Sequence, residues 1–436
     1  METVRKDILP YVALTCVKTD KFKTNCLSVS LLTQLCREDA ARNALIPYVL
    51  RRGTTYHPDM ESIANALDDL YGACIEPFVR KKGEIQSIGF YADFIDDAYV
   101  PGNAAVLEQV TALLGELLFS PNTRGGLFLP AYVESEKTKL LEKIRGRVND
   151  KRSYALFRLS ELMCQFEDYS VGALGSEEEA ESIGYQKLTK HYRSLLANSP
   201  IEIFYCGSAD FDRVEAAVLN AFSILPRGEF DLELGTDIRM NALESNVRHY
   251  TDELDVTQGK LAVGFRLGPC MEDPDPAAIR VFNAIYGGSL TSKLFTHVRE
   301  RLSLCYYASS GVDLHKGILY VSSGIAFDKF DAALSEILAQ LDAIRQGNIT
   351  DEELDSARKY VAGNLRTLMD SPAQLEDFYL SSLLQGFDCT PDELAAMIDF
   401  VTKEDIVAIA NGTECDTIYF MKGLPEEDEE EEAHES

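Results

Sequence analysis

The histidines are the first residues to consider for chemistry. Two histidines at positions i and i+4 of a helix bind zinc, and a glutamate beside one of them activates a water for hydrolysis. No two histidines of this chain stand four apart, so neither H-x-x-E-H nor H-E-x-x-H occurs. The nearest pattern is "HVRER", in which Arg301 fills the second ligand slot, and we expect His297 to lie on a helix surface. The histidines are His57, His191, His249, His297, His315 and His434.

Other catalytic patterns are absent from the sequence as well. The chain has no G-x-S-x-G nucleophile elbow and no P-loop. Its ten cysteines include no C-x-x-C pair, and the most regular spacing, Cys16, Cys26 and Cys36, is too wide for a zinc finger. A disulfide framework is typical of short secreted domains. We therefore predict reduced core thiols and no peptide hydrolysis by this chain alone.

Length and charge limit the class of protein. A chain of 436 residues, 46% of them hydrophobic, predicts two or more packed units. The formal charge is −29, and without the acidic tail the body still has 42 basic against 63 acidic residues, which disfavours nucleic acid and anionic membranes as partners. We expect residues 425–436 to be an acidic disordered tail. With no apolar run long enough to span a membrane and no secretion signal, we expect a cytoplasmic protein.

The chain repeats itself. Residues 133–163 align without a gap to residues 354–384, at an offset of 221, so that Arg145 matches Arg366. Such a run argues for duplicated domains. Strands followed by helices in each copy predict an α+β fold, with a mostly antiparallel sheet packed against helices. The predicted divisions are an N-terminal domain over 1–226, a linker over 227–246, a C-terminal domain over 247–424 and the tail over 425–436.

The second copy has the clearest local signals. "GKLAVGFRLG" alternates as a strand, and "LCYYASSG" and "GILYVSSGIA" read as two strands joined through "VDLHKG". A capping box in "TDEE" predicts the start of a helix. In the segment "SLTSKLFTHVRERLS", one helical stripe is expected to contain Leu290, Leu294, Phe295, Val298 and Leu302.

These patterns resemble the insulinase, pitrilysin and mitochondrial-processing-peptidase family of metallopeptidases. The likeness rests on "YGGSLTSKLFTHVRERLSLCYY" in the second half and on "RRGTTYHPDMESIANALDDLYGA" in the first. More narrowly, the chain resembles a bacterial branch of inactive metalloproteases, the YmfF type, which is tied by name to 5-aminopentanol modification of elongation factor P. The resemblance implies two duplicated LuxS- or processing-peptidase-like domains that form a clam-like chamber.

The resemblance also shows where a zinc site would lie. Active members of the family have H-x-x-E-H on the helix before the Gly-Thr stretch, and a carboxylate from a later helix completes the site. Aligned on that stretch, the motif positions fall on Ala44, Pro47 and Tyr48. The later helix retains Glu136, but the slot seven residues on is Lys143, whose ammonium would repel a dication. We therefore predict a degenerate zinc motif and no metal or other cofactor in this chain.

Arg299 and Tyr306 are the residues that the resemblance marks for substrate binding. In active relatives the equivalent residues approach the zinc from the opposite half or from the partner subunit. A guanidinium and a phenol are strong donors to a developing oxyanion. The alternative is that Arg299 pairs with a surface acid and that Tyr306 is a core residue of its strand. Gly287 and Gly288 are expected to form a backbone turn with close packing.

Two functions stay open at this point. In the first, the chain is the non-catalytic subunit of a heterodimeric zinc metallopeptidase. A homologous subunit with H-x-x-E-H holds the zinc, while this chain binds the peptide substrate. In the second, the chain is a non-proteolytic scaffold or peptide-binding module, associated with elongation factor P modification. A homodimer of the isolated chain is also left open, and an active zinc enzyme with unorthodox ligands is the least favoured interpretation.

Overall fold

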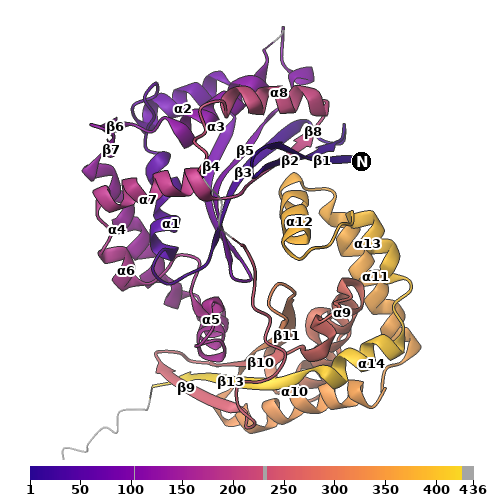
Figure 1. Ribbon diagram of the computed structural model, residues 1–436. Coiled ribbons are helices and arrows are strands. Elements are labelled where there is room, and N and C mark those ends of the chain that lie inside the picture. The colour runs from indigo at the N-terminus through magenta and orange to yellow at the C-terminus, as the bar shows by residue number, and fades with distance from the viewer. Residues whose placement is uncertain (103, 229–232, 425–436) are drawn as a thin grey trace, which may run out of the picture. The chain divides into compact units, whose positions relative to one another are not determined.

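The computed structural model describes residues 1–102, 104–228 and 233–424, and the chain divides into two compact units (Figure 1). The predicted acidic tail, 425–436, lies outside the described residues. Unit 1 consists of Met1–Val148, Cys164–Ile238 and Asn364–Leu394, and unit 2 of Asn149–Met163, Arg239–Gly363 and Ala395–Ser436.

Unit 1 is built on a six-stranded sheet in the order β1-β2-β8-β3-β5-β4. Neighbouring strands are antiparallel, except that β2 and β8 are parallel. Strands β2 and β3 are buried along almost their whole length, because helices cover both faces of the sheet. The strands are β1 (Glu2–Leu9), β2 (Val12–Lys18), β3 (Thr24–Gln34), β4 (Cys74–Lys82), β5 (Ile85–Ile95) and β8 (Ile201–Gly207), and a separate pair is formed by β6 (Thr123–Arg124) and β7 (Leu127–Phe128).

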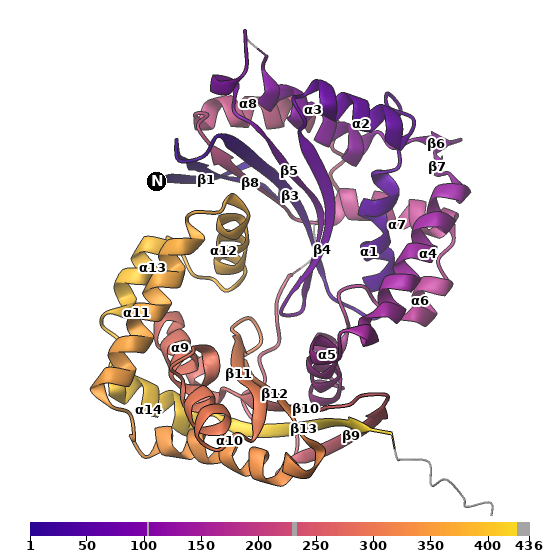
Figure 2. The same ribbon diagram turned by 180° about the vertical axis from the view of Figure 1, so that it is seen from behind.

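The helices of unit 1 lie on both faces of this sheet. Figures 1 and 2 show α1, α3 and α7 on one face and α12 on the other. The face with α1 contains the main apolar core, and on the other face Leu375 of α12 packs against Val17 and Phe204. The helices are α1 (Ala40–Leu50), α2 (Met60–Asp69), α3 (Val106–Phe119), α4 (Pro130–Gly146), α6 (Glu177–Glu181), α7 (Tyr185–Asn198), α8 (Phe211–Ala221) and α12 (Pro372–Leu384).

Unit 2 has a five-stranded sheet in the order β11-β12-β10-β13-β9, in which only β13 and β9 are parallel. Helix α5 packs against β10 and β13. The strands are β9 (Arg248–Leu254), β10 (Gly259–Arg266), β11 (Cys305–Asp313), β12 (Ile318–Ile325) and β13 (Glu414–Gly423). The helices are α5 (Lys151–Met163), α9 (Pro276–Asn283), α10 (Phe330–Arg345), α11 (Asp351–Leu368), α13 (Pro391–Ile398) and α14 (Lys403–Gly412), and α11 and α13 each continue across a unit boundary.

The two sheets share one plan, which confirms the predicted duplicated α+β fold. The strand series β2-β8-β3-β5-β4 corresponds to β9-β13-β10-β12-β11, with the parallel pair at the same end of each. The repeat offset of 221 also holds for the helices, because α4 and α5 begin at Pro130 and Lys151, and α11 and α12 at Asp351 and Pro372. Two matching helices are exchanged, since α5 belongs to unit 2 and α12 to unit 1. The halves of the repeat and the compact units are therefore different divisions of the chain.

Local expectations for the second copy are confirmed except at two leucines. The capping box forms, with the Thr350 amide donating to Glu353 over 2.8 Å and the Glu353 amide donating to Thr350 over 3.1 Å. The strand pair is β11 and β12. The apolar stripe is wrong at Leu290 and Leu302, which are 76% and 51% exposed. The segment η6 (Leu294–Arg301) is a π-helix, whose wider turn does not follow a 3.6-residue period.

The described residues also bear on the cysteines and on membrane insertion. No disulfide joins any of the ten cysteines, all of which lie in the described ranges, and Cys16, Cys26, Cys164 and Cys206 are buried. Burial raises the pKa of Cys16 and Cys206 to about 12, so these thiols stay protonated at neutral pH. Within the part of the chain that is described, no helix is long and apolar enough to cross a bilayer.

Candidate functional site

Helices α1 and α4 pack against each other in unit 1 and border a cavity of about 250 Å³. This is where the sequence places the degenerate zinc motif, since Tyr48 and Lys143 both line the cavity. The remaining lining residues come from these two helices and from the segments that follow α1 and begin β4. The full lining is Tyr48, Arg51, Arg52, Met60, Glu76, Pro77, Glu136, Lys139, Leu140 and Lys143.

Tyr48 and Lys143 contact each other. The Lys143 ammonium lies 4.1 Å from the centroid of the Tyr48 ring, which is a cation–π distance. By the resemblance to active family members, Tyr48 falls where the second histidine is expected and Lys143 where the later carboxylate is expected. The two positions expected to share a metal ion therefore do lie close together in the structure. They are occupied by a phenol and an ammonium, which contact each other directly.

Ala44 and Pro47 are both buried residues of α1. Ala44 is fully buried, and Pro47 is buried inside α1. A proline at this position removes one helical hydrogen bond, the one to the carbonyl of Asn43. The helix continues to Leu50 nevertheless, and the amide of Arg51 donates to the Pro47 carbonyl over 3.1 Å. A methyl and a pyrrolidine thus face the protein interior where a ligand and a general base would be needed.

Glu136, the one acid retained from the motif region, is already engaged. It is 6% exposed, and its Oε1 accepts hydrogen bonds from Arg52 at 3.2 Å and from Lys139 at 2.8 Å. The Arg52 guanidinium also lies 5.1 Å from the centroid of the Tyr132 ring. Two cations therefore pair with one oxygen of this carboxylate.

A divalent cation does not fit this cavity. Four cationic side chains line it against two carboxylates. The side chains at the motif positions are a methyl, a pyrrolidine, a phenol and an ammonium, none of which is a usual zinc ligand. Across the described ranges, no group of three or more His, Cys, Asp or Glu side chains is placed to hold a metal ion. The side chains at these positions therefore do not fit a conventional zinc site.

Arg299 lies on η6 in unit 2, with 42% of its side chain exposed. Its guanidinium carbon is 4.7 Å from the centroid of the Phe295 ring, and its Nε is 3.5 Å from Glu300. The Phe295 ring supports one side of the guanidinium, and the side chain is partly exposed. Pairing with a neighbouring acid was the structural alternative from sequence, and the contact with Glu300 is of that kind.

Tyr306 is exposed because of a β-bulge. Cys305 pairs with Ile325 and Tyr307 with Gly324, so Tyr306 is the additional residue between them. It is 68% exposed, so the alternative that it is a core residue of the strand is wrong. Burial raises the pKa of Cys305 despite the opposing effect of Arg299, so this thiol is not a thiolate nucleophile at neutral pH.

Gly287 and Gly288 end the π-helix η5 (Ala284–Gly288), so the segment is helical and not a reverse turn. A Cβ atom on Gly287 would lie 2.7 Å from the side chain of Leu294 and from the backbone nitrogen of Ser310. On Gly288 it would lie 2.6 Å from Asn283. Close packing at this point leaves no room for a larger residue.

Sequence reasoning missed Arg51, Arg52 and Lys139, which supply most of the positive charge of the α1–α4 cavity. The spacing of Glu136 and Lys139, three residues apart on one helix, is a signal that could have identified their ion pair. Arg52 reaches Glu136 from beyond the end of α1, and no local pattern predicts that contact.

Comparisons with known proteins agree with this geometry. A sequence profile described as "Peptidase M16 inactive domain" matches residues 182–361. The chain is 33% identical over 409 residues to a Bacillus subtilis protein named "Probable inactive metalloprotease YmfF", covering 93% of this chain and 95% of that protein. The chain belongs to the M16 peptidase family. This confirms the predicted family, and the side chains at the motif positions make the chain an M16 member without conventional zinc ligands.

Solved structures confirm the M16 fold over almost the whole chain. A conserved protein from Enterococcus faecalis V583 is 27% identical, with a TM-score of 0.87, and the match covers 98% of this chain and 100% of that one. A peptidase M16 inactive domain from Pseudomonas fluorescens has a TM-score of 0.78 at 16% identity, over 97% and 98% of the two chains.

Proposed function

We propose that this M16 chain is the non-catalytic subunit of a two-chain zinc metallopeptidase. A homologous subunit with H-x-x-E-H would hold the zinc, and this chain would bind the peptide substrate through Arg299 and Tyr306. The observation that carries the proposal is an asymmetry. The motif positions of unit 1 carry no zinc ligands, whereas the two donors of unit 2 are exposed in part, 42% for the Arg299 side chain and 68% for Tyr306.

The local structure supports a role for both donors. A bulge exposes Tyr306, and bulges commonly re-aim a side chain next to a functional site. Arg299 rests on an aromatic ring, which reduces the conformational entropy that the guanidinium would lose on binding a carbonyl or an oxyanion. A phenol and a guanidinium are donors that suit a peptide backbone or the charge that develops during hydrolysis.

The test is a cleavage assay of the full chain mixed with a homologous H-x-x-E-H subunit, using a panel of unstructured peptides. We expect cleavage only in the mixture, and a loss of about tenfold or more in kcat/KM with Arg299→Ala. Arg301→Ala is the matched control, because it removes the same charge from an exposed position on the same segment. Cleavage that is unaffected by adding this chain, or equally affected by both substitutions, would contradict the proposal.

A non-proteolytic scaffold or peptide-binding module is the second candidate. The observation that favours it is that Arg299 already has partners in Phe295 and Glu300. In that case the mixture would form a complex, but Arg299→Ala and Tyr306→Phe would leave cleavage unchanged. An association with elongation factor P modification is tested by deleting the gene for this chain and measuring the mass of elongation factor P. If the chain has no part in the modification, the factor keeps its modified mass.

A further inference from the structure

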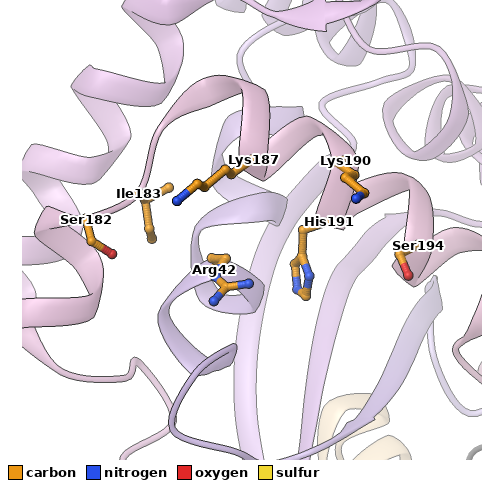
Figure 3. Close-up of a pocket in the computed structure, with 7 residues that line it drawn as sticks. All are labelled: Arg42, Ser182, Ile183, Lys187, Lys190, His191 and Ser194. Carbon is orange, nitrogen blue, oxygen red and sulfur yellow. The ribbon is translucent and has the colours of Figure 1, made fainter.

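A second cavity of unit 1 lies between α1 and α7, and its lining is almost entirely polar (Figure 3). Its volume is about 470 Å³, and α7 contributes residues at positions i, i+3, i+4 and i+7, which form one face of that helix. Leu188, Tyr192, Leu195 and Leu196 of α7 are buried in the core. The lining is Arg42, Ser182, Ile183, Lys187, Lys190, His191 and Ser194.

The charge of this cavity is opposite to that of the protein. Three permanent cations and an imidazole line it, and no carboxylate does, in a chain of net charge −29. Asp39 pairs with the cavity residue Arg42 at 2.7 Å and lies 3.8 Å from Nδ1 of His191. Lys187 and Lys190 form no hydrogen bond or ion pair with any described residue. Two ammonium groups therefore remain available to an external anion.

His191 is held in place by a buried hydrogen-bond network. Its Nε2 lies 2.6 Å from Oδ1 of Asn43, and only 14% of its side chain is exposed. The Asn43 amide nitrogen donates to Gln86 at 2.8 Å and to Thr33 at 3.2 Å, which fixes Oδ1 as the atom that faces the imidazole. Nε2 then carries the proton that is donated to Asn43, and Nδ1 is the ring nitrogen left for other partners.

The α1–α4 cavity provides a contrast. Its cations are engaged by the protein itself, since Lys143 lies on the Tyr48 ring, and Arg52 and Lys139 share Glu136. The α1–α7 cavity keeps its lysines unpaired, and Figure 3 shows the side chains of Lys187, Arg42 and His191 around one common space. An anionic ligand is therefore better matched to the α1–α7 cavity.

We propose that the α1–α7 cavity binds a phosphate group, free or carried by a small organic molecule. Its tetrahedral oxygens accept several hydrogen bonds at once, and the lining offers two ammonium groups, a guanidinium and two serine hydroxyls as donors. With Ile183 as the only apolar lining residue, an apolar ligand is disfavoured. The negative charge of the whole chain argues against a polyanion such as nucleic acid. The proposal stands independently of the proposed peptidase role.

The test is isothermal titration calorimetry of the full chain at low ionic strength with inorganic phosphate, glycerol 3-phosphate and acetate. We expect one saturable site for a phosphate probe, with acetate much weaker. Tighter binding of glycerol 3-phosphate than of inorganic phosphate would identify an organic monoester as the ligand. Equal or tighter binding of inorganic phosphate would identify the free ion.

Paired variants distinguish binding at a specific site from a general effect of the protein's positive charges. Lys187→Gln with Lys190→Gln should weaken phosphate binding by about tenfold or more, since each tenfold corresponds to about 1.4 kcal/mol. The control, Lys329→Gln with Lys359→Gln, removes the same charge from exposed positions of unit 2 and should change binding less than about twofold. All four positions are exposed, so unchanged melting temperatures are expected. Absence of saturable binding, acetate binding as tight as phosphate, or equal losses in both variants would overturn the proposal.

Discussion

The ammonium of Lys143 on α4 lies 4.1 Å from the centre of the Tyr48 ring on α1. The resemblance to active M16 peptidases implies that in those relatives the same two positions hold a metal ion between the two helices. Here a cation–π contact joins the helices directly. Beside it, Arg52 and Lys139 pair with Glu136. The connection between α1 and α4 therefore requires no metal ion.

A double-mutant cycle measures this connection. We expect Tyr48→Leu and Lys143→Met to couple by about 0.5–1 kcal/mol in the free energy of unfolding, as for other partly exposed cation–π pairs. Urea unfolding of the two single variants and the double variant gives the coupling energy. The matched control is a cycle between Tyr48 and Lys139, whose ammonium contacts Glu136 instead, and it should show almost none. Strictly additive effects for Tyr48 and Lys143 would show that the contact does not contribute.

Glu202 predicts a pH dependence of the stability of unit 1. Burial in β8 raises the pKa of this carboxyl from 4.5 to about 7, although Arg5 lies 2.8 Å away and acts in the opposite direction. The folded state therefore binds the proton more tightly than the unfolded state. The contribution of Glu202 to the free energy of unfolding is therefore favourable only at low pH, and it is lost as the pH rises from about 4.5 to about 7.

The substitution Glu202→Gln should remove this loss, because the amide does not ionise. We expect the variant to be more stable than the parent at about pH 8, by at most roughly 3 kcal/mol, with a smaller difference at about pH 5. Melting temperatures at the two pH values check this. Glu61→Gln, at an exposed position of α2, is the control and should leave the pH dependence unchanged. The same pH dependence in Glu202→Gln and the parent would refute the prediction.

Asp416 organises a buried ion cluster in unit 2. Its two oxygens accept hydrogen bonds from Arg248 and Arg266, and Asp416 and Arg266 are essentially inaccessible to solvent. Asp416→Ala should destabilise the protein by about 3–5 kcal/mol, because it leaves two buried guanidiniums without this carboxylate. Asp342→Ala breaks an exposed pair with Arg345 and should cost less than about 1 kcal/mol. Comparable losses of unfolding free energy in the two variants would contradict this account.

The exchange of α5 and α12 predicts that the two halves of the repeat do not fold separately. A chain of residues 1–226 lacks α12, whose Leu375 packs in the core of unit 1 and whose Glu376 pairs with Arg80. We expect this fragment to be poorly soluble, because the uncovered sheet face exposes apolar residues. Co-expression with residues 227–436 should restore solubility, as measured by size-exclusion chromatography. A soluble 1–226 fragment that melts cooperatively by itself would disprove the prediction.

Local patterns predicted the elements better than they predicted contacts. The offset of 221 residues was enough to place the matching helices, and the alternation in "GKLAVGFRLG" predicted β10, because a repeat and an alternation can both be seen in the order of the residues. The π-turn geometry of η6 broke the helical period and exposed Leu302. Contacts between distant segments, such as Arg52 with Glu136, carry no such local signal. The α1–α7 cavity was missed for the same reason, since Arg42 and the lysines of α7 are far apart in sequence.

The measurement that tests the central claim most directly is the zinc content of the purified full chain after equilibration with Zn²⁺ and removal of loosely bound ions. The side chains at the motif positions predict far less than one zinc per chain, and no change with Lys143→Met, which removes the ammonium from the α1–α4 cavity. One tightly bound zinc per chain that is lost on Tyr48→Phe or on Glu136→Gln would place a metal site in unit 1 and would contradict the account.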